Sequence, residues 1–148
     1  MAVVFTGIAF GRPRFGDAGL LGAVITTMVV VGVGYAALGG WDGLLQKPAP
    51  DLISHAATPI LTALSWVIFV RVGHSRPSHI GLWIAPMVLY FAYAFARGAV
   101  TREYAYPFID VNAVGWSSAL IFAGAMVGTA AIVAAVMLGL DRLRARRR

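Results

Sequence analysis

Long apolar stretches alternate with short segments rich in glycine, proline and charge along this chain. A helix needs ~20 apolar residues to cross ~30 Å of hydrocarbon. Stretches near this length cover approximately residues 19–38, 52–70, 80–96 and 114–140. The third is at the short end, and the fourth is longer than necessary, which predicts that it tilts or extends beyond the membrane. The pattern therefore predicts an all-α integral membrane protein, a bundle of four transmembrane helices in a single membrane domain spanning 1–148.

The composition agrees with this pattern. Of the 148 residues, 59% are hydrophobic and only 12% are charged, whereas about a quarter of the residues of a soluble domain are charged. The formal net charge of +6 is not spread over a face that could bind nucleic acid, because arginines concentrate in the segment 141–148. This segment is predicted to be a basic cytoplasmic tail beside anionic headgroups, which contribute about 1 kcal/mol per basic residue.

Basic residues also predict the orientation of the helices. Cytoplasmic loops are enriched in lysine and arginine. Arginines precede the first stretch, lie between the second and third, and follow the fourth, at Arg12, Arg14, Arg71, Arg76 and the tail. The alternate loops hold Lys47, Arg97 and Arg102 together with acidic residues. We therefore expect both termini to be cytoplasmic.

The N-terminal segment Met1–Phe10 is apolar but lacks the basic start and small-residue cleavage site of a signal peptide. At about ten residues it is also too short to span a bilayer. It is interpreted as the end of a helix whose beginning precedes this chain, or as a short interfacial segment.

A polar stripe follows one face of the second stretch, because the spacings of four and three residues are helical. Its members are Asp51, His55, Thr58, Thr62 and Ser65. Pro59 has no N–H, so the carbonyl of His55 loses its helical partner. Two interpretations stay open: a functional pocket, or hydroxyls that bond to their own helix while His55 caps a helix interface.

A second polar group is expected around the end of the third stretch. Tyr93 and Arg97 share a face there, and the aromatic segment Tyr104–Asp110 follows. These residues form either an aromatic belt with a snorkelling arginine or part of a site. With alternating topology they share the non-cytoplasmic end with His55, which predicts a cavity there, lined by Thr58, Thr62, Tyr93, Arg97, Tyr106 and Asp110.

The fourth stretch contains the pattern Gly124-x-x-x-Gly128, which permits close approach of helices. It indicates either packing inside the monomer or a homo-oligomer. There is no cysteine, and His74 and His79 alone do not make a metal site. We expect no metal and no cofactor.

The segments Leu52–Pro59 and Tyr104–Asp110 resemble the androgen-induced-protein-like family of multi-span membrane proteins, including its bacterial members. The resemblance covers approximately residues 19–140. It implies the cytoplasmic membrane of a bacterium and, through the animal members, a lipid hydrolase that uses a threonine and a histidine. His55 is the position matching the catalytic histidine. Thr6 does not match the nucleophile, so two alternatives stay open: an N-terminally truncated chain, or a natural form without the nucleophile.

Two functions follow as hypotheses. The first is a non-enzymatic membrane protein that binds a lipid or a partner through the polar cavity. The alternative is a membrane-embedded hydrolase of lipid esters, in which His55 activates a threonine hydroxyl and Asp110 or a freed carbonyl orients the imidazole.

Overall fold

A computed structural model of the chain describes residues 17–43, 46–70 and 72–147. These residues are helical or in turns, with no strand among them. Four helical segments of the described chain are long and apolar enough to cross a membrane: Ala18–Ala37, Ala49–Ile68, His79–Thr101 and Val111–Arg146. The four predicted stretches are thus confirmed as helices. The N-terminal segment Met1–Phe10 lies outside the described residues.

The first helix is α2 (Ala18–Ala37). The second rod joins α3 (Ala49–Leu52), the π-helical turn η3 (Ile53–Ala57) and α4 (Thr58–Phe69). The third is α5 (His79–Thr101), and the short 3-10 turn η4 (Pro107–Ile109) leads into α6 (Val111–Arg146).

Two helices extend beyond their predicted ends, since backbone hydrogen bonds can continue after the apolar side chains stop. α5 ends only at Thr101, where Arg102, with a left-handed φ of 61°, terminates the helix. α6 continues to Arg146, so most of the predicted tail is helical. Gly115, with φ of 77°, interrupts the start of α6, and only glycine adopts that conformation without strain.

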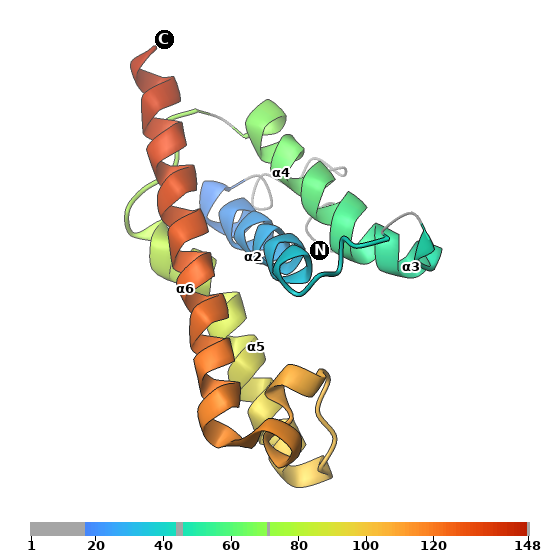
Figure 1. Cartoon of the computed structure of the whole chain (residues 1–148). Helices are drawn as coiled ribbons and strands as arrows, with labels where there is room; N and C mark the ends of the chain where they lie inside the picture. Colours follow the sequence, from blue (N-terminus) through green and yellow to red (C-terminus); the bar gives the residue numbers. More distant parts are fainter. Residues whose placement is uncertain (1–16, 44–45, 71, 148) are drawn as a thin grey trace.

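Helix α2 is central and packs against α4, α5 and α6 (Figure 1). Glycines make these approaches possible. A Cβ atom at Gly22 would lie 2.1 Å from the ring of Trp83 on α5, and one at Gly32 would lie 2.8 Å from Cβ of Pro59 on α4. Small residues serve this purpose in membrane proteins, where van der Waals packing holds helices together.

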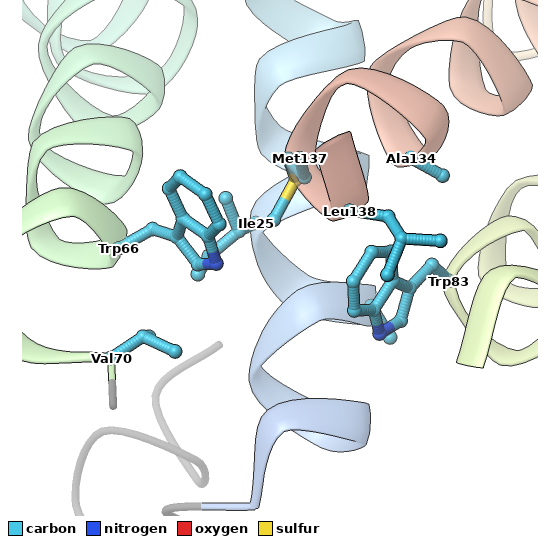
Figure 2. Packing of buried hydrophobic residues seen from close by; sticks show 8 residues of the cluster. Ile25, Trp66, Val70, Trp83, Ala134, Met137 and Leu138 are labelled. Carbon is cyan, nitrogen blue, oxygen red and sulfur yellow. The ribbon is translucent and has the colours of Figure 1, made fainter. Parts of the chain in front are cut away.

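Two clusters of buried residues form the core. In the first, Trp66 of α4 and Trp83 of α5 lie on either side of Ile25 of α2 and of residues from α6 (Figure 2). In the second, Val30 of α2 meets Phe91 of α5 and Ile109 of η4. The clusters lie at successive levels of α2, so this helix contributes to both parts of the core.

The end of α6 is tied to the connection between α4 and α5. The carboxylate of Asp141 is buried and accepts hydrogen bonds from the backbone N–H groups of Gly73 (2.8 Å) and Ser75 (2.9 Å). Nη2 of Arg144 donates to the carbonyl of Val67 (2.8 Å), and its guanidinium lies 5.6 Å from the ring centre of Trp66. The two backbone hydrogen bonds satisfy the carboxylate of Asp141, which would be costly to bury unpaired.

Candidate functional site

The best-defined polar group lies where the end of α2 meets the start of the second rod. We call it the Tyr35 cluster, comprising Tyr35, Asp51 and His55. The rod begins after Pro48 and has Pro50 in its first turn, where a missing N–H leaves no helical bond unmade. Asp51 follows in that turn, and His55 lies one turn later in η3.

The carboxylate of Asp51 joins the two helices. Its Oδ1 lies 2.9 Å from Nδ1 of His55, and its Oδ2 accepts a hydrogen bond from the hydroxyl of Tyr35. The rings of Tyr35 and His55 are stacked, with centroids 4.7 Å apart and planes 15° from parallel. Nζ of Lys47 lies 5.1 Å from the centre of the Tyr35 ring. One carboxylate, two donors and a nearby ammonium therefore share a small volume.

The backbone around His55 departs from the α-helix. The N–H of Thr58 donates to the carbonyl of Ile53, a π-helical bond five residues back. Pro59, two residues after this turn, has no N–H to offer the carbonyl of His55. The sequence predicted this lost partner, and the structure accommodates it with a wider turn. Single π turns occur frequently at functional sites.

The Nδ1 atom of the His55 imidazole contacts neighbouring residues of the same rod. Besides Asp51, it lies 2.9 Å from Oγ of Ser54, which itself donates to the carbonyl of Pro50 (2.7 Å). Among the described residues, no hydrogen bond reaches Nε2 of His55. An imidazole whose Nδ1–H points to a carboxylate can therefore present Nε2 to a ligand, as an acceptor when the ring is neutral and as a donor when it is protonated.

The hydroxyls further along the polar stripe bond to their own helix. Oγ1 of Thr62 donates to the carbonyl of Thr58 (2.6 Å), and Oγ of Ser65 donates to that of Thr62 (2.7 Å). Thr62 is buried. The polar stripe thus has two parts. Asp51 and His55 belong to the Tyr35 cluster, whereas the hydroxyls of Thr62 and Ser65 bond to their own helix, as one of the two interpretations expects.

The other predicted site residues lie on the last turns of α5 or in the connection between α5 and α6. Arg97 donates to the backbone carbonyl of Glu103 (3.1 Å) and lies 3.5 Å from its carboxylate. Tyr106 stacks on Phe108, with ring centroids 5.1 Å apart. Tyr93 is exposed on the surface of α5.

Asp110, the remaining candidate, accepts a hydrogen bond from the backbone N–H of Asn112 (2.9 Å) and so caps α6. The structure places the predicted site residues in two groups, because the α3 end of the second rod and the connection before α6 lie apart (Figure 1). The group that orients the His55 imidazole is Asp51, not Asp110.

The sequence reasoning missed Tyr35 altogether and treated Asp51 as one member of a stripe. A signal was present for both. A short connection between two antiparallel helices brings the last turn of the first beside the first turn of the second, which pairs a tyrosine near the end of α2 with Asp51.

Among the described residues, no group of three His, Cys, Asp or Glu side chains could hold a metal ion. No protein-family model matches this chain, and neither the curated proteins nor the solved structures include a significantly similar one. The resemblance to the androgen-induced-protein-like family therefore rests on the quoted segments alone.

Proposed function

We propose that this chain is a multi-pass membrane protein that binds a lipid through the Tyr35 cluster. The observation that carries the proposal is the shared carboxylate of Asp51, which is bonded to Tyr35 of α2 and lies 2.9 Å from His55 of η3. Polar side chains are rare in membrane segments, where they usually face protein or water and mark functional sites.

The composition of the Tyr35 cluster suits an oxygen-rich lipid group. Nζ of Lys47 lies beside Tyr35, and Nε2 of His55 is the remaining hydrogen-bonding position of the imidazole. The ammonium can donate to a carboxylate, phosphate or ester oxygen, and Nε2 does so when the imidazole is protonated. The acyl chains would then contact the neighbouring apolar surface of the second rod, where Ile53 and Leu61 are exposed.

The orientation belongs to the same proposal. Asp141, Arg144 and the exposed arginines that follow lie at the opposite end from the Tyr35 cluster, since α6 ends beside the connection between α4 and α5. Basic residues favour the cytoplasmic side. On this proposal the Tyr35 cluster lies at the non-cytoplasmic end and both termini lie in the cytoplasm. The cytoplasmic membrane of a bacterium is the location that the resemblance implies.

A second candidate function is hydrolysis of a lipid ester. A carboxylate that holds Nδ1 of a histidine is the arrangement that prepares Nε2 as a general base, and Asp51 stands in that relation to His55. The nucleophile would be a threonine, as the resemblance implies. Among the described residues, no threonine hydroxyl is hydrogen-bonded to the imidazole, which is why lipid binding is preferred.

The two functions are separated by one set of variants in lipid nanodiscs. Binding is measured with a fluorescent fatty acid, and hydrolysis with a chromogenic butyrate ester. We expect Asp51→Asn and His55→Ala to weaken binding about tenfold or more, since a hydrogen bond to a charged group contributes about 1.5–3 kcal/mol. Tyr93→Phe, on the exposed surface of α5, is the matched control.

Lipid binding alone is supported if these variants lose affinity and the wild type releases no butyrate. Hydrolysis that is abolished in His55→Ala supports the second candidate. Unchanged affinity in both variants, with no hydrolysis in the wild type, rejects the Tyr35 cluster as a ligand site.

A further inference from the structure

The connection between α5 and α6 runs back along α5 instead of projecting away from it. The ring of Tyr104 lies so close to Gly98 that a Cβ atom there would be 2.1 Å from Cε1 of the tyrosine. Further along, Ile109 is completely buried in the cluster that contains Phe91 and Ala94. From Gly98 to Phe91 α5 rises about 10 Å, so the connection returns by roughly that distance.

The returning segment is anchored on α6 as well. The ring of Phe108 packs on Phe122, with centroids 4.2 Å apart. Ile109 shares its cluster with Ala123 of the same helix. The turn η4 thus packs against α6, and its Ile109 also reaches the buried cluster to which α5 contributes.

Part of the backbone of this segment is bonded inside it. The N–H of Ile109 donates to the carbonyl of Tyr106 (3.2 Å), and that of Asp110 to Pro107 (3.3 Å). The side chain of Asp110 accepts from Asn112. Irregular backbone is tolerated at membrane depth only where protein or water satisfies it, and a position close to the headgroups leaves water within reach of the remaining N–H groups.

The exposed side chains near this turn are amphipathic rings. Tyr93 is 64% exposed, Trp116 53% and Tyr106 42%. Tyrosine and tryptophan concentrate at the boundary between acyl chains and headgroups, because one end of the ring is apolar and the other can form hydrogen bonds. Rings of this type would be unfavourable as a hydrated surface patch but suit that boundary.

The length of α6 supports the same placement. From Trp116 to Asp141 the helix rises about 37 Å, which exceeds a hydrocarbon core of ~30 Å by a few ångströms at each side. When Asp141 and the arginines beyond it lie at one face of the bilayer, Trp116 reaches the opposite boundary.

We propose that residues 104–116 form a re-entrant element that binds the lipid interface, with η4 below the headgroups and the rings of Tyr106 and Trp116 at their level. The partner of this surface is the bilayer itself. The inference is independent of the Tyr35 cluster, which lies at the end of α2 and contributes no residue to it.

The absence of cysteine from the chain makes a direct test possible. Single cysteines carrying a spin label are placed in the protein in phosphatidylcholine–phosphatidylglycerol vesicles. Accessibility to a water-soluble nickel complex and to oxygen then reports depth. Glu103→Cys is the water reference and Ile121→Cys, on the exposed surface of α6, is the hydrocarbon reference. Ala105→Cys and Trp116→Cys are the test positions.

The expected result is that both test positions lose most of the nickel accessibility of Glu103→Cys and gain oxygen accessibility toward that of Ile121→Cys. Nickel accessibility at both positions equal to that of Glu103→Cys would overturn the proposal, because the segment would then lie in water. Circular dichroism establishes that each variant retains its helices.

A second measurement leaves the segment free of labels. The emission of Trp116 is obtained as the difference in fluorescence between the wild type and Trp116→Phe. We expect lipids brominated close to the headgroup to quench this emission most strongly. If iodide in water quenches the Trp116 emission and no brominated lipid does, the interfacial placement is wrong.

Discussion

Asp51 and His55 lie one helical turn apart, with Oδ1 of the carboxylate 2.9 Å from Nδ1 of the imidazole. The hydroxyl of Tyr35, on the preceding helix, bonds to the other oxygen of the same carboxylate. The carboxylate of Asp51 therefore contacts His55 within the second rod and also connects this rod to α2. Changes at Asp51 or His55 should affect both helix pairing and ligand binding.

Tyr35→Phe removes one hydrogen bond and keeps the ring that stacks on His55. We expect the free energy of unfolding in detergent micelles to fall by about 1–3 kcal/mol, since the bond has a charged acceptor. Thermal or denaturant unfolding followed by circular dichroism measures this. Tyr93→Phe serves as control and should change stability by less than about 0.5 kcal/mol. Equal effects of the two variants would show that the Tyr35 bond does not stabilise the fold.

Gly32→Ala tests the contact between α2 and α4. The new Cβ would lie 2.8 Å from Cβ of Pro59, a rigid ring that cannot rotate away. Overpacking of this kind costs about 1–3 kcal/mol, and separation of the helices should also weaken the contact of Tyr35 with His55. The matched control is Gly81→Ala in α5, where nothing lies within 4 Å. If Gly32→Ala is as stable as Gly81→Ala, the close approach of α2 and α4 is not required.

Asp141→Asn weakens the link between the end of α6 and the connection that follows α4. The buried carboxylate accepts two backbone hydrogen bonds, from Gly73 and Ser75. Its replacement by a neutral amide should reduce stability by about 1–3 kcal/mol and speed amide hydrogen exchange at Gly73 and Ser75. Exchange followed by mass spectrometry measures the second effect. The neighbouring exposed residue provides the control variant, Arg142→Ala, which should leave exchange at both sites unchanged.

Gly124 and Gly128 are exposed, and no described atom lies within 4 Å of a Cβ built at either. Packing inside the described part of the chain, one of the two interpretations of this pattern, is therefore not observed. The other interpretation of the pattern, a homo-oligomer that forms through this face, stays a prediction. The double change Gly124→Ile and Gly128→Ile should then reduce the dimer fraction in micelles, as measured by sedimentation equilibrium, while Gly139→Ile leaves it unchanged. A wild type that is monomeric at all concentrations would contradict the prediction.

The helices themselves were predictable from the sequence, while the candidate site was predictable only in part. Asp51 and His55 fall on one face because they are four residues apart, and this local relation was read correctly. The partner of Asp51 was not, since Tyr35 is sixteen positions away in the chain and on another helix. The expected meeting of His55 with Arg97, Tyr106 and Asp110 assumed that residues at one end of a bundle are neighbours. Instead, the start of the second rod lies beside the end of α2 and apart from the connection between α5 and α6 (Figure 1), and α6 reaches α4 only near its own C-terminal end.

For the part of the chain that the structure describes, the sequence by itself determined the four long apolar helices and roughly where each begins and ends. The physical reason is that helix formation and apolar character depend on local composition, which is read along a single segment. Only the tertiary structure decided that Asp51 joins Tyr35 to His55. The pairing depends on how α2 and α4 are rotated against each other, and the close fit of Gly32 on Pro59 fixes that rotation. The contact of Asp51 with His55 is thus local, and its bond to Tyr35 is tertiary.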